Sequence, residues 1–349
     1  MTRRVTELRC GLSKTEDITA LPSFLPLLIT GVTGVPGYSI FKYLHAKYPN
    51  HVTAIRPVRY WPLRDAGIIP LDMEDRKGLA ALMEKKKFKS ILNGAGSCAL
   101  KSCEMNPVLA YRVNVQSALN VLEIIGDRDI RMIHLSTDLV FPGKSEGLYS
   151  EEDPIAPVTM YGKTMAIAED VITLRCPSAV ILRISLPMGI SVNGHAGAID
   201  WILSRFKKNN PATLYFDEMR SPFYCEDFNS IVELALENRE MKGIYHLGSH
   251  RHLSLYQIGQ IVNKVGGYAP HLLKGCMRKE AGPMPPRAGN VTMANRKLIQ
   301  GLGVDPFRNW PYLEHHVPDG NDWHYHRPGH MVFHPEEIHK CLYRIPMAC

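Results

Sequence analysis

The segment GVTGVPG holds three glycines, Gly31, Gly34 and Gly37, at three-residue intervals. An apolar run at 25–29 precedes them and a helical pattern follows. Between a strand and a helix, such glycines permit a tight turn, let the backbone approach a pyrophosphate and let the helix pack on the sheet. The spacing is GxxGxxG rather than GxGxxG, and a plain glycine-rich turn is the alternative. We expect a dinucleotide cradle at this junction.

The residues after the second expected strand bear on the choice of nucleotide. A site for NAD would favour an acidic residue there, to bind the ribose hydroxyls. The chain carries Arg56 and Arg59 instead, and a guanidinium can pair with a 2′-phosphate through two hydrogen bonds. We therefore expect NADP as the cofactor, with NAD and plain surface arginines as the alternatives. Asp72 follows a further short strand and is a candidate for contact with the adenine amine.

Short apolar strands alternate with helices in the first half of the chain. We expect strands at 25–30, 51–57, 90–95, 131–136 and 179–184, and helices at 35–47, 76–87, 107–125 and 160–174. This alternation predicts a parallel sheet covered on both faces. After about residue 187 the pattern is less regular, with two further helices expected at 227–237 and 254–264 and a loop at 281–290.

Composition narrows the class of protein. The 349 residues carry a net charge of +7, thinly spread, which suits anionic small molecules and does not require nucleic acid. Eight cysteines without a CxxC pair indicate reduced thiols in a cytoplasmic protein. The N-terminus lacks an apolar signal segment and no uninterrupted apolar stretch reaches the roughly 18 residues of a membrane span, so we expect neither secretion nor a membrane.

Two longer motifs, HLSTDLVFPG at 134–143 and YSEEDPIAPVTMYGKTMAIAED at 149–170, resemble those of the extended short-chain dehydrogenase/reductases. NGAG at 93–96, ILRISLPMG at 181–189, DEMRSPFYCEDF at 217–228 and PPRAGNVTMANRKLIQGLG at 285–303 follow in the order typical of the dTDP-4-dehydrorhamnose reductase branch, within the NAD-dependent epimerase/dehydratase superfamily. The resemblance implies an α/β fold, a Rossmann doubly wound parallel sheet with a smaller C-terminal substrate-binding lobe. It divides the chain into an extension (1–24), a Rossmann domain (25–186, with 220–236 returning to it), a substrate lobe (187–312) and a His-rich tail (313–349).

The resemblance also implies a chemistry, hydride transfer between a nicotinamide and a carbonyl of a nucleotide-linked or phosphorylated sugar. Tyr161 would deliver or remove the proton, Thr137 would polarise the oxygen, and Asp138 would lie beside them. Arg220 and Arg287 would clamp a substrate phosphate, or form structural ion pairs. The residues expected to contact the cofactor are Gly31, Thr33, Gly34, Val35, Pro36, Gly37, Arg56, Arg59, Asp72, Met73, Asn93, Gly94, Ala95, Gly96, Ser136, Met165, Ser185 and Pro187.

The chain departs from the family pattern four residues after Tyr161. The family has a lysine there, which lowers the pKa of the tyrosine and holds the nicotinamide ribose, whereas this chain has Met165. Lys163 is rotated by roughly 200° around the helix and is a poor substitute. A thioether cannot donate a hydrogen bond or stabilise a phenolate. Reduction of a ketone needs only a neutral phenol and could still proceed slowly, whereas oxidation needs a phenolate and suffers more.

Three functions remain open on this sequence. The first is an NADPH-dependent reductase of a keto group on a nucleotide-activated sugar or a similar substrate. The second is a cofactor-binding protein without turnover, resembling the regulatory beta subunit of methionine adenosyltransferase and acting on a partner enzyme. The third is a redox-neutral lyase, dehydratase or epimerase with Asp138 as the acid. A homodimer is compatible with each of them.

The C-terminal tail departs from the family. We expect it to fold over the substrate lobe or to form a subunit contact, through Trp310, Trp323, Tyr325 and Phe333. Its histidines could ligate a metal, but no cysteine or carboxylate constellation accompanies them, so no metal is expected. The histidines considered are His324, His326 and His330.

Overall fold

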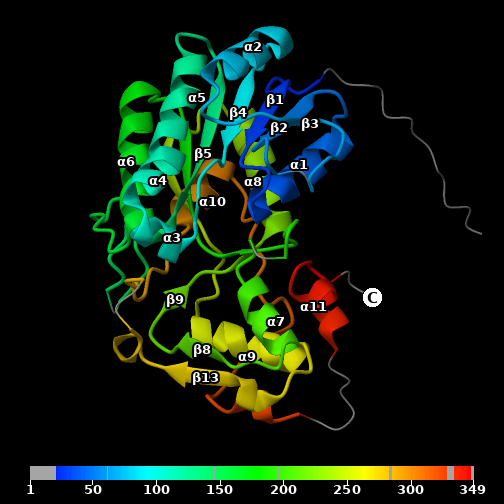
Figure 1. The fold of residues 1–349 in the computed structure, drawn as a ribbon, viewed down its shortest axis with the longest axis vertical. Coiled ribbons are helices and arrows are strands. Elements are labelled where there is room, and N and C mark those ends of the chain that lie inside the picture. The colour runs from blue at the N-terminus through cyan, green and yellow to red at the C-terminus, as the bar shows by residue number, and fades with distance from the viewer. Residues whose placement is uncertain are drawn as a thin grey trace, which may run out of the picture.

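The computed structural model describes residues 21–60, 62–144, 146–194, 196–282, 285–327 and 334–346. Its core is a seven-stranded sheet with the order β11-β6-β5-β4-β1-β2-β3, in which every neighbouring pair is parallel (Figure 1). The strands are β1 (Leu27–Thr30), β2 (Val52–Arg56), β3 (Ile68–Pro70), β4 (Ser90–Asn93), β5 (Arg131–Thr137), β6 (Val180–Ile184) and β11 (Gly243–Leu247). The predicted α/β fold is therefore confirmed. The strand order reverses between β1 and β4, which is where ligands bind in such sheets.

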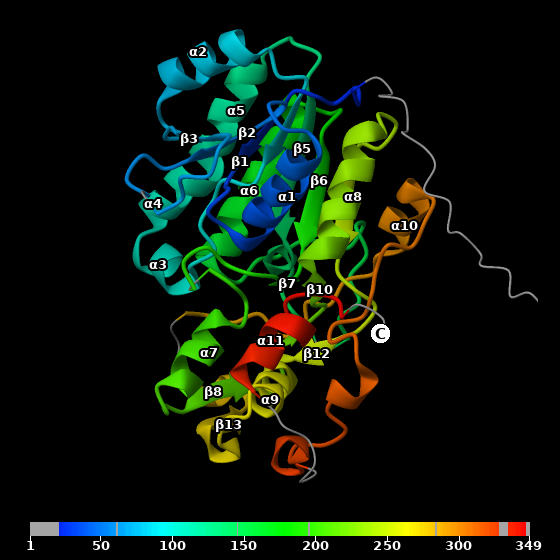
Figure 2. The same cartoon turned by 90° about the vertical axis from the view of Figure 1, so that its right-hand side faces the viewer.

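Helices cover both faces of this sheet, because its strands are apolar on both sides (Figures 1 and 2). One face packs against α1 (Val35–Lys47), α8 (Cys225–Glu237) and α10 (Arg296–Leu302). The other packs against α2 (Arg76–Lys86), α5 (Ser117–Ile125) and α6 (Met160–Arg175). Within α1 the buried side chains Ile40, Phe41 and Leu44 recur at helical spacing, so one stripe of the helix faces the strands.

The helix expected at 107–125 is interrupted. It consists of α4 (Pro107–Tyr111), one π-helical turn, η1 (Arg112–Gln116), and α5, and the shorter α3 (Leu100–Met105) precedes it. The π turn contains Asn114, which is fully buried and donates a 2.8 Å hydrogen bond to Thr164 Oγ1 on α6. Its Oδ1 accepts from the amide of Ser97, also at 2.8 Å. Asparagine is a poor helix former, and here both ends of its amide are used to hold other segments.

The remaining elements form a smaller lobe below the sheet (Figure 1). It contains α7 (Asp200–Lys207), α9 (Leu255–Val265) and three two-stranded sheets, β7–β10, β9–β12 and β8–β13. The strands are β7 (Pro187–Met188), β8 (Ala212–Tyr215), β9 (Met219–Arg220), β10 (Phe223–Tyr224), β12 (Leu253–Ser254) and β13 (Leu273–Cys276). Short 3-10 turns complete the fold, namely η2 (Asp138–Val140), η3 (Pro270–Leu272), η4 (Arg278–Glu280), η5 (Glu314–His316) and η6 (Trp323–Tyr325). Ser254 and Gln257 form a capping box that begins α9.

The sheet extends one strand beyond the expected division of the chain. The expected Rossmann domain ends at 186, but β11 pairs in parallel with β6 over 180–184 and 243–247. Helix α10 packs near β11 and belongs to the same side of the molecule. These two segments therefore lie with the Rossmann sheet rather than in the smaller lobe. A short segment such as GIYHL is apolar enough for either the sheet or the smaller lobe. Its position is therefore decided by its pairing with β6, which is a tertiary contact.

The C-terminal tail docks on the smaller lobe. The helix α11 (Pro335–Cys341) and the residues after it contribute Ile338, Leu342 and Tyr343 to the apolar core of that lobe, together with Trp310 and Trp323. Trp310 is fully buried and donates from Nε1 to the carbonyl of Leu342 at 2.8 Å. The predicted docking is thus confirmed for these residues, whereas the Tyr325 side chain is exposed.

The histidines considered as metal ligands do not form a cluster in the part of the chain that the structure describes. The His324 ring is buried beside Gln260, with Nδ1 3.2 Å from its Nε2, and His326 lies at the surface. His330 and Phe333 fall outside the described residues. Within the described part of the chain, no helix is long and apolar enough to cross a membrane.

Four buried histidines predict acid sensitivity. Burial lowers the pKa to about 4 for His134, His316 and His324, and to about 3 for His246. The unfolded chain therefore binds more protons than the folded one below pH 6.5, and stability falls as the pH drops from 6.5 towards 4, by up to about 1.4 kcal/mol per pH unit for each group. Denaturant titrations between pH 4.5 and 7.5 measure the slope. His246→Asn should flatten it, and an unchanged slope would contradict the assignment.

Candidate cofactor and active site

The glycine turn follows β1 and leads into α1. Gly31 has φ +73°, and a Cβ there would lie 2.0 Å from the carbonyl oxygen of Gly94, so only glycine fits. At Gly37 a Cβ would lie 2.3 Å from the Gly31 oxygen, which explains the close packing of helix and turn. At Gly34 the nearest atom is 3.5 Å away, so the space in front of Gly34 is open. The N-terminus of α1 has no side-chain cap and leaves its amides free for a phosphate.

The rest of the turn is consistent with a pyrophosphate site. Val35 is buried and Pro36 occupies the first turn of α1, where the amide it lacks is not needed. Thr33 is half-buried. Together with Gly34, these residues form an open turn that could hold the diphosphate of a dinucleotide.

The two arginines after β2 differ in their surroundings. Arg56 is buried, and its guanidinium donates to the carbonyls of Leu63 at 2.6 Å, Pro57 at 3.0 Å and Val58 at 3.1 Å. Its donors therefore hold the loop after β2, whereas Arg59 is exposed. Asp72 accepts from the amide of Val58 at 2.9 Å and steadies the same loop. Of these two arginines, Arg59 is the one that faces solvent. Arg59 is therefore the arginine that we still expect to contact a 2′-phosphate.

Polar side chains link the ends of β1, β4 and β5. Thr30 Oγ1 donates to Asn93 Oδ1 at 2.7 Å, and Asn93 Nδ2 lies 3.0 Å from His134 Nδ1. The amide of Ala95 donates to Thr30 Oγ1 at 3.2 Å. Asn93 is fully buried, and its side chain bonds to groups inside the protein. The surface of this turn that would face a cofactor is therefore formed by backbone and small residues. Those small residues are Gly94, Ala95 and Gly96.

Tyr161 lies in the first turn of α6, which begins at Met160 with Thr159 as its cap. Its phenol lies beside Thr137, at the end of β5. Burial raises the pKa of Tyr161 well above its usual value, and the Thr137 hydroxyl opposes this only in part. The Asp138 carboxyl acts in the same upward direction, and the thiols of Cys98 and Cys103 also lie near the phenol. The Tyr161 phenol is therefore protonated over the whole physiological range.

Met165 lies one helical turn further along α6 and is 4% exposed. It belongs to an apolar cluster with Leu139, Phe141 and Met293, against which Tyr161 also packs. Lys163 points to solvent and offers no ammonium in its place. The position of the family lysine is therefore occupied by a packed apolar side chain.

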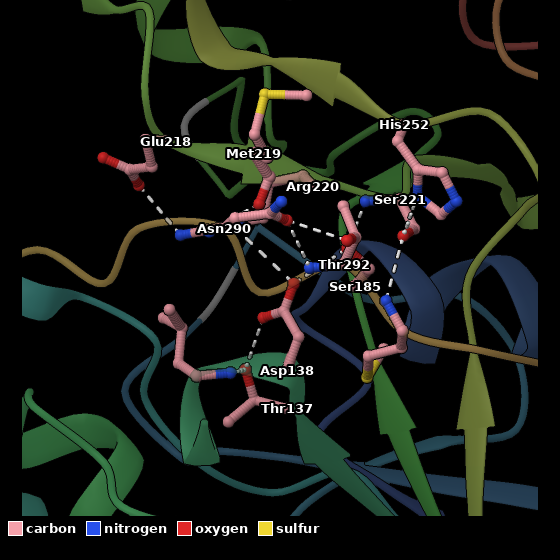
Figure 3. A network of polar contacts seen from close by, with 12 residues as sticks. Thr137, Asp138, Ser185, Glu218, Met219, Arg220, Ser221, His252, Asn290 and Thr292 are labelled. Atoms are coloured by element: carbon pink, nitrogen blue, oxygen red, sulfur yellow. Dashed lines mark hydrogen bonds and ion pairs between the residues drawn. The ribbon is translucent and has the colours of Figure 1, made fainter. Parts of the chain in front are cut away.

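Beside Thr137, the Asp138 carboxylate is buried and fully engaged (Figure 3). Its Oδ2 accepts from Ser185 Oγ at 2.8 Å and lies 3.7 Å from Nε of Arg220. Burial raises the pKa of Asp138, while Arg220, Ser185 and Thr137 lower it. Ser136 points the other way and donates to Glu169, which is paired with Arg183 inside the protein.

Neither predicted substrate arginine is free of partners. Arg220 is 4% exposed and donates to Glu218 Oε1 at 2.8 Å, which is the ion-pair alternative for this residue. Arg287 is 26% exposed, donates to Glu218 Oε2 at 3.2 Å and lies over the Tyr215 ring at 4.4 Å. It borders an open cavity of about 600 Å³ in the smaller lobe. The other lining residues are Asp217, Arg278, Lys279, Ala281, Gly282, Pro285 and Pro286.

The remaining predicted contacts lie at the edges of the site. Pro187 begins β7, directly after the segment that holds Ser185. Met73 is partly buried and its carbonyl accepts from Asn120 at 2.7 Å, so its backbone is used internally.

Sequence reasoning missed Glu218, which both arginines share, and the thiols beside Tyr161. One available indication was the place of Glu218 two residues before Arg220 in the segment DEMR, since a buried guanidinium requires a partner.

A dinucleotide-type glycine turn, an all-parallel sheet with its switch between β1 and β4, and a tyrosine beside a threonine define the class of extended short-chain dehydrogenase/reductases. The model of the family described as RmlD substrate binding domain matches residues 25–317, and the chain belongs to this family.

Individual relatives have low sequence identity to this chain. The dTDP-4-dehydrorhamnose reductase of Aggregatibacter actinomycetemcomitans is 26% identical over 291 residues, which are 80% of this chain and 94% of that protein. Methionine adenosyltransferase 2 subunit beta of Xenopus laevis is 25% identical over 311 residues, 85% of this chain and 91% of that protein. The solved structure of dTDP-4-dehydrorhamnose reductase from Bacillus anthracis in complex with NADP has a TM-score of 0.69 at 18% identity, covering 81% of this chain and 95% of that one.

Proposed function

We propose that the protein is an NADPH-dependent reductase of a keto group on a nucleotide-activated sugar or a similar anionic substrate. The observation that carries this is the Tyr161 phenol beside the Thr137 hydroxyl, at the same edge of the parallel sheet as the glycine turn. A phenol with a raised pKa stays protonated, so it keeps the proton that reduction needs, although as a weaker acid, and it lacks the phenolate that oxidation needs. The proposed direction is therefore reduction.

NADPH, when bound, would supply the hydride. The turn at 31–37 would hold its pyrophosphate, Arg59 its 2′-phosphate, and the segment with Ser185 and Pro187 would lie near the nicotinamide. Tyr161 would donate a proton to the carbonyl oxygen of the substrate, and Thr137 would orient that oxygen. With Met165 in place of lysine, the nicotinamide ribose loses a hydrogen-bond donor.

The cavity beside Arg287 is the proposed place for the phosphates of the substrate. The Arg278 guanidinium donates both to Asp217 at 3.0 Å and to the Arg287 carbonyl at 2.9 Å, whereas the Arg287 guanidinium donates to Glu218 through Nη1, so Arg287 and Lys279 are the cations proposed to meet an anion. Together they favour a substrate that carries phosphate over a free sugar.

The test is in two parts. Calorimetry should show binding of NADPH and weaker binding of NADH, and NADPH absorbance should fall when a matching keto-sugar nucleotide is added. No heat with either coenzyme would overturn the proposal. So would silence with every keto-sugar nucleotide, provided that it persists in the Met165→Lys variant.

A matched pair of glycine variants separates binding from folding. Gly34→Ala should leave the unfolding midpoint unchanged, because its Cβ makes only an ordinary contact, yet weaken NADPH binding by tenfold or more, because the methyl group enters the pyrophosphate space. Gly31→Ala should unfold at lower denaturant, because its Cβ meets backbone. Calorimetry and denaturation measure the two effects. Equal nucleotide affinity for Gly34→Ala and wild type would argue against the cradle.

A regulatory subunit is the second candidate. It is favoured by the absence of an ammonium beside Tyr161 and by the similarity to the methionine adenosyltransferase beta subunit over most of the chain. Affinity purification from cells should then recover a stable partner enzyme, and recovery of none would remove this candidate.

A redox-neutral reaction with Asp138 as acid is the third. The carboxylate is buried and bonded on all sides, which disfavours it. Full activity of Asp138→Asn would exclude that role.

A further inference from the structure

A chain of buried polar contacts crosses from the smaller lobe to the proposed active site (Figure 3). We propose that Arg220 is a positioning residue, which holds Thr137 in place through Asp138 and so makes the placement of this hydroxyl depend on docking of the smaller lobe. The inference rests on the proposed function, because it identifies the contacts that hold Thr137 in its proposed catalytic position.

Arg220 is anchored within the smaller lobe. It lies in β9, where it is opposite Leu253 of β12. Its guanidinium donates to Glu218 Oε1 at 2.8 Å and to the Met219 carbonyl at 3.1 Å. Both Arg220 and Glu218 are nearly inaccessible to water, at 4% and 2% exposed. The position of the guanidinium is therefore set by the lobe.

The same guanidinium faces the sheet. Its Nε lies 3.7 Å from Asp138 Oδ2, and that oxygen also accepts from Ser185 Oγ at 2.8 Å. Ser185 Oγ in turn accepts from the amide of Ser221 at 3.0 Å, so backbone of the lobe reaches the same point. Two independent contacts from the lobe thus converge on the carboxylate of Asp138.

Asp138 passes this constraint to Thr137. The Thr137 hydroxyl donates to Asp138 Oδ1 at 3.3 Å and accepts from the amide of Leu139 at 3.2 Å. A buried carboxylate without a cation tends to take up a proton or to turn towards water, and either change removes an acceptor from Thr137. The ionisable and polar groups facing Asp138 are Arg220, Ser185, Thr137, Glu218 and Tyr161. Arg220 is the one cation among these facing groups, and it opposes the effect of burial on the pKa of Asp138.

Two backbone amides report on the contacts directly, without any substrate or cofactor. The Leu139 amide is bonded to Thr137, and the Ser221 amide is bonded to Ser185. Hydrogen exchange should be measured in peptides that span 137–141 and 219–223, in the full chain. Arg220→Met should speed exchange at Leu139 by about tenfold or more, although the change is made in the other lobe.

Glu218→Gln is the matched control, because it removes the charge of this partner, keeps an oxygen that accepts from Arg220, and leaves the Asp138 contact. It should leave exchange at Leu139 within about twofold of wild type. A double-mutant cycle of Arg220→Met with Asp138→Asn should show coupling of about fivefold or more in the unfolding equilibrium constant. Additive effects, or faster exchange confined to 219–223, would overturn the proposal and leave Arg220 as a local ion-pair residue.

If the Arg220→Met variant does not fold, the Asp138→Asn variant tests the proposal by itself. It should speed exchange at Ser221 across the boundary, and unchanged exchange there would overturn the inference. Because none of these measurements needs turnover, failure of the proposed reductase activity is seen separately, as silence of the wild-type protein with NADPH. If activity is found, Arg220→Met should lower kcat more than it raises KM, and Arg220→Lys should restore part of the loss.

Discussion

Replacing Met165 by lysine is expected to raise the rate of NADPH-dependent carbonyl reduction by up to about 10²–10⁴-fold. The new ammonium would lie one helical turn from Tyr161, where it would lower the raised pKa of the phenol and donate to the nicotinamide ribose. Burial raises the pKa of Tyr161, and the neighbouring Asp138 carboxyl acts in the same direction. The decay of NADPH absorbance with a keto-sugar nucleotide measures the effect.

Two further variants test the cause of that gain. Met165→Gln has a similar volume and can donate a hydrogen bond, but it carries no charge, so it should recover only a small part of the rate. Met165→Leu should behave as the wild type, because position 165 lies in an apolar cluster. A gain for glutamine equal to that for lysine would contradict the electrostatic explanation, and no gain for lysine would show that the chain has lost more than this one group.

The Trp310→Ala substitution should destabilise the protein by about 3–5 kcal/mol. Trp310 is fully buried in the core of the smaller lobe and bonds the carbonyl of Leu342, so its removal leaves a cavity under the docked tail. Chemical denaturation gives the change in free energy of unfolding. Limited proteolysis should then cut near 334–346 faster than in the wild type.

Trp310→Phe is the control for this substitution. It keeps an aromatic ring in the core and loses the indole donor, so it should destabilise the protein by less than the alanine variant and keep the tail protected. If alanine cost less than about 1 kcal/mol, the tail would not be part of the core, contrary to its burial.

The sheet was predictable because the sequences of its strands indicate burial on both faces. The run LLI in β1 and the pair IL in β4 are apolar at consecutive positions, which is the pattern of a covered parallel strand. The sequence of strand β11 does not show this pattern. Its position in the sheet depends on pairing with β6, which lies more than fifty residues earlier in the sequence. The π turn at Asn114 likewise depends on Ser97 and Thr164, which local propensity does not include.

The candidate site was predictable where backbone geometry dictates the residue. Gly31 and Gly37 are required by contacts with other backbone, and their spacing shows this in the sequence. Side-chain direction was not predictable. Arg56 and Arg220 occur at suggestive places, yet the first holds backbone carbonyls and the second holds carboxylates, because a buried guanidinium must satisfy its donors within the protein.

The seventh strand also affects how the molecule is made. Because β11 ends at Leu247 and α8 covers one face of the sheet, a nascent chain cannot complete its first domain when the ribosome reaches β6. The first part of the smaller lobe, from β7 to β10, is made in between, and the edge of β6 stays exposed until later residues emerge. A recombinant fragment that stops at 186 should therefore aggregate, whatever its sequence suggests about a self-contained nucleotide-binding unit.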